Sequence, residues 1–213
     1  MQMMRVSNRH LVCLFFKAQA LTWLALGKHV KALSLLDHIL GFLPEDRHAL
    51  ASRAHVLVQL NRLDESVLNL QQLAGMAGSK TQMGTTWFNL AFVLQQKGHH
   101  EEACSAFENA VLHCPWLGQA WYGLGLSLIQ QRKLHAARNA IKQTTILQPM
   151  APHGWYQLAH VDLALEEPEK ARQVLDHLRR FEPKVARQLE LDIQQYADTS
   201  NSQQNGRAHV NLC

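Results

Sequence analysis

Apolar side chains recur along this chain with the spacing of α-helices. In one well-ordered stretch they follow the spacing i, i+3, i+4 and i+7: Trp87, Leu90, Ala91 and Leu94. Gly98 then ends this helix, and Pro115 closes the stretch where a helix cannot continue. A second stripe lies between them, at Ala103, Phe107 and Ala110. The pattern predicts two helices joined by a short turn.

This pattern returns every 34 residues. The tryptophans and prolines keep the step: Trp87, Trp121 and Trp155, then Pro115, Pro149 and Pro183. A period of this size is typical of helix-turn-helix arrays, in which each unit stacks on its neighbours to bury a face that it cannot bury alone. The chain divides into five such units: 13–46, 47–80, 84–117, 118–151 and 152–185. Three extra residues, 81–83, separate the second unit from the third.

Small residues share one position in the last three units: Ala91, Gly125 and Ala159. We expect the two helices of a unit to cross there. These features resemble the tetratricopeptide repeat family, whose units carry a Trp, a Leu-Gly or Leu-Ala pair, a central Ala, an aromatic residue and a closing Pro. The resemblance covers 13–185 and is weakest in the second unit, where Ser66 replaces the central alanine. It implies an all-α, right-handed superhelical solenoid of about five helix-turn-helix repeats with a C-terminal capping helix.

The two ends of the chain differ in character. Residues 184–197 have helically spaced apolar positions and are expected to form the capping helix, whereas the polar segment 198–213 is expected to be disordered. Residues 1–12 are taken as a separate N-terminal segment. An apolar run after Arg5 and Arg9 mimics a secretory signal, but it is short, and Lys17 interrupts it. A cytoplasmic protein is favoured, with a secreted or periplasmic one as the alternative.

The family resemblance also predicts a binding surface. In this family the first helix of each unit lines a concave groove, and the register places nine residues there: His55, Phe88, Phe92, Gln95, Tyr122, Leu126, His153, Tyr156 and His160. Exposed rings on such a surface favour binding of an apolar helical or extended protein segment. The alternative is that Phe88 and Tyr122 only pack against neighbouring helices. The spaced basic residues with which some family members clamp a terminal carboxylate are incomplete here.

Charge adds one weaker candidate site. Between Asn109 and Val161 there is no Asp or Glu, but four basic residues occur: Arg132, Lys133, Arg138 and Lys142. This patch could steer an acidic partner, although an ordinary solvated convex face is the favoured interpretation. Overall, 21 basic and 17 acidic residues lack the one-sided excess of nucleic-acid-binding proteins, so nucleic acid is not an expected partner. No stretch approaches the roughly 20 apolar residues that span a bilayer.

The sequence shows no motif for catalysis, metal binding or cofactor binding. The densest group of possible metal ligands, His99 to Glu102 with Cys104, lies at the turn between two helices, where polar residues are expected. The four cysteines lack the close pairs of a zinc site and fit a reducing compartment. No phosphate-binding loop, nucleophile elbow or zinc protease motif is present. The chain is therefore not expected to be an enzyme or to carry a cofactor.

The favoured function is that of a non-catalytic adaptor or chaperone-like protein that holds a partner segment in its aromatic groove. The alternative is a structural repeat protein that self-associates into a homo-oligomeric scaffold. Small chaperones of type III secretion are similar in being compact repeat proteins with a groove for an apolar segment, but no motif in this sequence singles them out.

Overall fold

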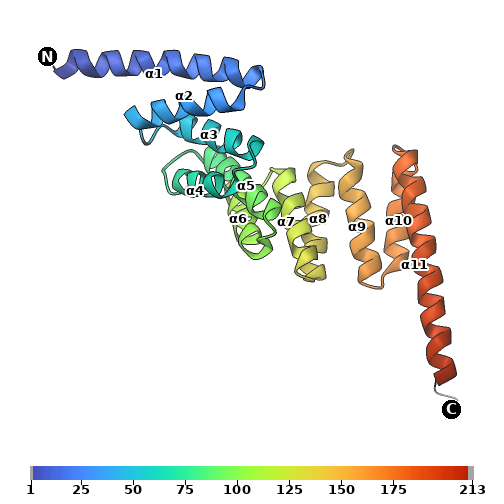
Figure 1. The fold of residues 1–213 in the computed structure, drawn as a ribbon. Helices are drawn as coiled ribbons and strands as arrows, with labels where there is room; N and C mark the ends of the chain where they lie inside the picture. Colours follow the sequence, from blue (N-terminus) through green and yellow to red (C-terminus); the bar gives the residue numbers. More distant parts are fainter. Residues whose placement is uncertain (1, 211–213) are drawn as a thin grey trace. The chain divides into compact units, whose positions relative to one another are not determined.

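The computed structural model describes residues 2–210 and the side chains of residues 12–199. Within residues 2–210 it contains eleven helices and no strand (Figure 1). The helices are α1 (Gln2–Ala25), α2 (His29–Phe42), α3 (Arg47–Gln59), α4 (Leu63–Ala74), α5 (Lys80–Gln96), α6 (His100–His113), α7 (Gly118–Gln130), α8 (Leu134–Leu147), α9 (Pro152–Ala164), α10 (Pro168–Leu178) and α11 (Pro183–Val210). The all-α class predicted from the sequence is confirmed.

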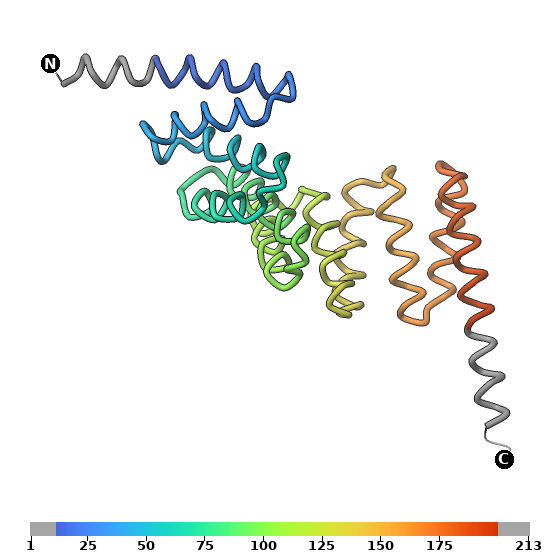
Figure 2. Tube along the Cα trace, viewed as in Figure 1, coloured from blue at the N-terminus to red at the C-terminus, as the bar shows by residue number. Residues whose placement is uncertain are grey.

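The chain forms two compact units, Met1–Cys114 and Pro115–Cys213. Helices α1 to α6 belong to the first, and α7 to α11 belong to the second. Within each unit, helices that follow one another in the sequence pack together, as the trace in Figure 2 shows. Each predicted repeat is therefore one pair of helices, from α1 with α2 to α9 with α10, and α11 packs on α9 and α10.

The turn inside every helix pair contains one residue with a left-handed backbone. Gly27 and Gly98 have φ of 66° and 78°, which glycine adopts without steric cost. The other three turns hold a non-glycine residue in the same conformation: Asn61, Arg132 and Glu166, with φ between 57° and 60°. This shared geometry lets the second helix fold back on the first at the same point of each repeat.

The predicted close approach of paired helices is confirmed. Ala91 and Ala159 are fully buried, and a Cβ built on Gly125 would lie 2.4 Å from Cδ1 of the buried Ile141. Gly84 is equally constrained, because a Cβ there would lie 2.5 Å from Sγ of Cys114. The helices can pack this closely only because the side chains at these positions are small or absent.

Side chains also tie one helix pair to the next in the first unit. Asp46 caps α3 by accepting a hydrogen bond from the backbone N–H of Ala49 at 2.9 Å. The same carboxylate binds Nζ of Lys17 on α1 at 2.5 Å. Two turns further along α3, Arg53 donates to Asp37 of α2 and to Asn69 of α4. Lys17 is therefore engaged within the protein.

Both ends of the repeat array differ from the prediction. Helix α1 begins at Gln2, so the segment taken as separate, residues 1–12, belongs to the first helix from residue 2 onward. Helix α11 continues to Val210, beyond the predicted end at 197, whereas a disordered tail was expected from 198. Neither segment contains proline, and Gln, Asn and Ala carry at most a modest helix cost. Residue 1 and residues 211–213 lie outside the described part.

Candidate partner-binding site

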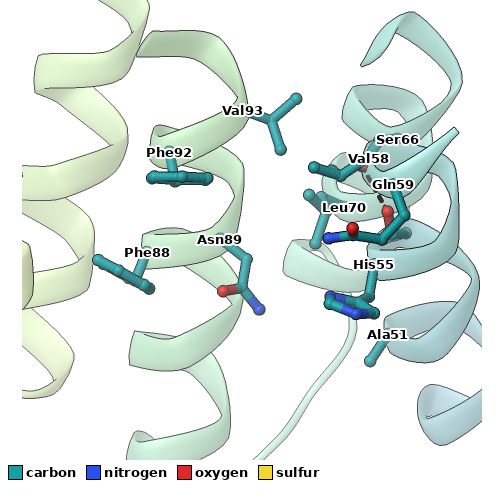
Figure 3. Close-up of a pocket in the computed structure, with 11 residues that line it drawn as sticks. Ala51, His55, Val58, Gln59, Ser66, Leu70, Phe88, Asn89, Phe92 and Val93 are labelled. Atoms are coloured by element: carbon teal, nitrogen blue, oxygen red, sulfur yellow. Dashed lines mark hydrogen bonds between the residues drawn. The ribbon is translucent and has the colours of Figure 1, made fainter. Parts of the chain in front are cut away.

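An open pocket lies in the first unit between α3 and α5, with α4 behind it (Figure 3). Its volume is about 320 Å³. Eleven residues line it: Ala51, Ala54, His55, Val58, Gln59, Ser66, Leu70, Phe88, Asn89, Phe92 and Val93. None of them is an acid, a lysine or an arginine. The pocket therefore offers apolar surface and neutral polar groups, with His55 as its only titratable side chain.

The α5 wall of the pocket carries two stacked phenylalanine rings. Phe88 and Phe92 lie one helical turn apart, with ring centroids 6.4 Å apart and an interplanar angle of 27°. Phe88 also contacts the buried ring of Phe107 on α6 at 6.1 Å, which fixes its position. Phe92 has no such cover and remains 44% exposed. The pair is a rigid apolar platform whose outer ring is open to solvent.

The pocket also holds three polar side chains on facing helices. His55 and Gln59 project from one face of α3 toward α5, and Asn89 projects from α5 toward them (Figure 3). All three are exposed, and within the described part of the chain none of them bonds to another protein group. Each can both donate and accept hydrogen bonds, so together they can satisfy the N–H and C=O groups of an incoming backbone.

The pocket floor explains why the second repeat departs from the family pattern. Ser66 is fully buried, and its hydroxyl donates to the carbonyl of Ala54 at 3.0 Å. A buried hydroxyl needs such a partner, and this bond joins α4 to α3. Serine therefore occupies the site of the usual alanine without leaving an unsatisfied group.

Tyr156 and His160, two residues predicted for the groove, contact the last helix instead. The hydroxyl of Tyr156 donates to Asp192 of α11 at 2.6 Å, and Nε2 of His160 lies 3.2 Å from the same carboxylate. Gln188 also donates to Asp192, at 3.0 Å. Burial, together with the neighbouring carboxylate, raises the pKa of Tyr156 to about 12. Helix α11 thus occupies the side of α9 that these two residues present.

The remaining predicted groove residues have differing environments. Tyr122 is half-buried against the core of the second unit and bonds to Gln157, and burial raises the pKa of its phenol. Leu126 is half-buried, and His153 is exposed at the start of α9. Gln95 is half-buried on α5 and does not line the pocket.

The structure therefore brings together His55, Phe88 and Phe92 of the nine predicted residues. It adds Gln59 and Asn89, which the groove prediction lacked. Gln59 follows His55 by four residues, so helical spacing alone was a signal for it. Asn89 lies between two predicted residues in sequence but points to a different side of α5 (Figure 3). The family resemblance did give a signal for it, because Asn89 matches one isolated position of the incomplete carboxylate clamp.

The basic patch is less available than the sequence indicated. Arg138 donates from Nε to Asp162 at 2.6 Å and lies 3.7 Å from Glu167. Asp162 is 2% exposed, so the guanidinium of Arg138 neutralises a buried carboxylate. Arg132, Lys133 and Lys142 are exposed. The acid-free sequence window ends immediately before Asp162, and the fold returns that acid to the patch.

No helix among the described residues is both long enough and apolar enough to cross a bilayer. No group of three or more metal-ligating side chains converges in the same part of the chain. In the His99–Glu102 stretch, Nδ1 of His99 lies 3.1 Å from Oε1 of Glu102 within one helical turn, and Cys104 is buried.

Comparisons with known proteins identify a matching repeat family and solved structures with a similar fold. A sequence profile of the tetratricopeptide repeat family matches residues 84–112. MamA 41-end from Desulfovibrio magneticus RS-1 is similar in structure, with a TM-score of 0.74, 16% identity, and coverage of 81% of this chain and 96% of that chain. YrrB, described as a TPR protein with an unusual peptide-binding site, has a TM-score of 0.69 and 20% identity, and the match covers 82% and 90% of the two chains. No curated protein matches the sequence.

Proposed function

We infer that this tetratricopeptide repeat protein acts by binding another protein. We propose that the pocket between α3 and α5 holds a segment of that partner. The observation that carries the proposal is the combination of an exposed ring at Phe92 with unbonded polar groups at His55, Gln59 and Asn89. A surface that only maintained the fold would not need both. The chain is then a holding module, of the adaptor or chaperone type, without chemistry of its own.

The lining of the pocket defines the segment that fits. A charged group buried against it would meet no opposite charge, which is costly, so the bound residues are uncharged. An aliphatic or aromatic side chain would pack on Phe88 and Phe92, while Gln59 and Asn89 bond the backbone beside it. The peptide-binding site named for YrrB supports a peptide ligand for a protein of this fold.

The cysteines support a proposed compartment. Cys13, Cys104 and Cys114 are buried and form no disulfide. Thiols that stay reduced suit a reducing environment, which supports our proposal of a cytoplasmic protein.

Selection from a random peptide library on the intact chain tests the function. We expect the selected peptides to share an apolar residue in an uncharged stretch. Their affinity, measured by fluorescence anisotropy, should fall at least about tenfold for Phe92→Ser and for Asn89→Ala, because each variant removes a central contact. Leu112→Ser is the matched control, since Leu112 is an exposed apolar residue of the same unit that lies outside the pocket. Peptides that bind all three variants as tightly as the wild type would show that the pocket is not the site.

A further inference from the structure

Helix α1 has an outer face that nothing in the first unit covers. Between residues 12 and 26, five large apolar side chains are each 40–65% exposed: Val12, Leu14, Phe15, Leu21 and Leu26. The only charged residue in this stretch is Lys17, which is half-buried and paired with Asp46. The inner face of α1, which includes Cys13 and Ala20, packs into the core of the unit.

Four exposed residues of α1 follow a heptad pattern. Leu14 and Leu21 are seven residues apart, and the exposed alanines Ala18 and Ala25 are also seven apart, so the four alternate at steps of four and three. This is the spacing of the seam between two supercoiled helices, with leucine and alanine at alternate positions. Alanines on such a seam let two helices approach closely, and each leaves room for a leucine of the facing helix.

The last helix of the chain presents a contrasting surface. The exposed positions of α11 from Lys184 to Thr199 are polar or charged, apart from Leu191. A polar outer face of this kind is what closes a stack of repeats against water. The exposed positions of α1 from residue 12 to residue 25 are apolar apart from Thr22, so this face has no such polar surface.

The exposed face has the size of a weak contact surface. The side chains on or beside the seam, Leu14, Phe15, Ala18, Leu21 and Ala25, expose roughly 400 Å², within the ~300–600 Å² of the largest apolar patch on a typical monomer. Two such faces in contact would bury on the order of 800 Å², which corresponds to reversible association in the micromolar range. Because the face bears no charge, two copies can meet there without like-charge repulsion.

We infer that two copies of this chain associate through the outer faces of their α1 helices. The helices run antiparallel about a two-fold axis, so that Leu14 lies against Ala25 of the second copy and Leu21 lies against its Ala18. Each leucine then fills the space left by an alanine, and the contact is isologous and closed. This surface is separate from the pocket between α3 and α5, and the inference does not rest on peptide binding.

Molar mass in solution tests the pairing. Light scattering over a broad micromolar range should show the wild type moving from the 24.2 kDa monomer to twice that mass. Leu14→Gln with Leu21→Gln should remain a monomer with an unchanged helical circular dichroism spectrum, since both side chains are exposed. The matched control is Leu68→Gln with Leu112→Gln, which replaces two leucines that are 67% and 74% exposed elsewhere in the same unit and should still dimerise. A wild type that stays monomeric, or a control that also loses the dimer, would overturn the inference.

Cross-linking tests the orientation without relying on a disruptive change. A chain with Leu14→Cys and Ala25→Cys should form two disulfides between copies on mild oxidation and run as a dimer on a non-reducing gel. These two positions are too far apart along one helix to bond within a chain, because eleven residues span roughly 16 Å. The absence of cross-linked dimer would rule out the antiparallel pairing.

Discussion

Replacing Arg138 by methionine removes the one guanidinium that neutralises a buried acid. The carboxylate of Asp162 is 2% exposed and accepts the bond from Nε of Arg138 at 2.6 Å. Glu167 lies 3.7 Å from the same guanidinium and adds a second negative charge nearby. Methionine keeps the apolar length of the side chain, so the change isolates the charge and its hydrogen bonds.

The cost of Arg138→Met is set by the unpaired acid that remains. Breaking a buried ion pair by removing one partner typically costs about 3–5 kcal/mol, and the lower end applies because Arg138 itself is partly exposed. We therefore expect the free energy of unfolding to fall by about 3 kcal/mol at neutral pH. Adding Asp162→Leu should recover most of this loss, since an apolar side chain of similar volume needs no partner.

The pH dependence has a definite sign. Burial raises the pKa of Asp162 above its ordinary value, and the bond from Arg138 offsets part of that rise. A raised pKa means that the folded chain holds the proton more tightly than the unfolded chain does, so stability is lost as pH rises through the folded pKa. Without Arg138 the pKa rises further, and the deficit relative to the wild type should shrink as pH falls from neutral.

Urea unfolding followed by circular dichroism measures these differences. The wild type, Arg138→Met and the double variant are compared at pH 7 and at a mildly acidic pH, and equal slopes are required for the comparison. A cost below about 1 kcal/mol, the level of an exposed pair, would refute the reasoning, because it would mean that Asp162 is well solvated. A double variant no more stable than Arg138→Met would refute it equally.

Two further predictions concern packing and the last helix. Gly84→Val should destabilise the chain by about 1–3 kcal/mol, because a Cβ there meets Cys114, whereas Gly41→Ala on α2, where a Cβ meets nothing within 4 Å, should raise the melting temperature slightly. The wild type should lose stability between about pH 10 and 12, because the fold raises the pKa of Tyr156 and its stabilising effect is lost as the phenol ionises. Tyr156→Phe should not show this loss. Thermal melts in this pH range measure the difference, and equal losses in variant and wild type would contradict the prediction.

The helix pairs were predictable because their cause is local and repeated. A helical stripe, a turn and a closing proline recur at one step, and the small residue at the helix crossing, as at Gly125, has a direct packing reason. The ends were less predictable. A hydrophilic sequence such as 198–210 meets the composition of disorder and is also compatible with a helix continued from an ordered one, so composition alone could not decide. The residues that interrupt the period, 81–83, fall in the first turn of α5, which the Ser79–Gln82 capping box starts.

The candidate site was only partly predictable, because register places a residue on a helix face but does not reveal what covers that face. Phe92 and His55 remain open, whereas Tyr156 at an equivalent kind of position is taken by Asp192, thirty-six residues further along the chain. The same holds for Arg138. Its charge was visible in the sequence, but its buried partner is supplied by the next helix, and an acid-free window in sequence gave no indication of it.

The left-handed turns are positions at which the protein could be stabilised by substitution. Asn61, Arg132 and Glu166 each adopt a backbone that costs a residue with a side chain roughly 1–2 kcal/mol, less for Asn, and that glycine adopts freely. Glycine at the last two positions should therefore make the protein more resistant to heat, while the pocket and the outer face of α1 stay unchanged. A scaffold for engineered binding could therefore be thermally stabilised by substitutions in its turns alone, one repeat at a time.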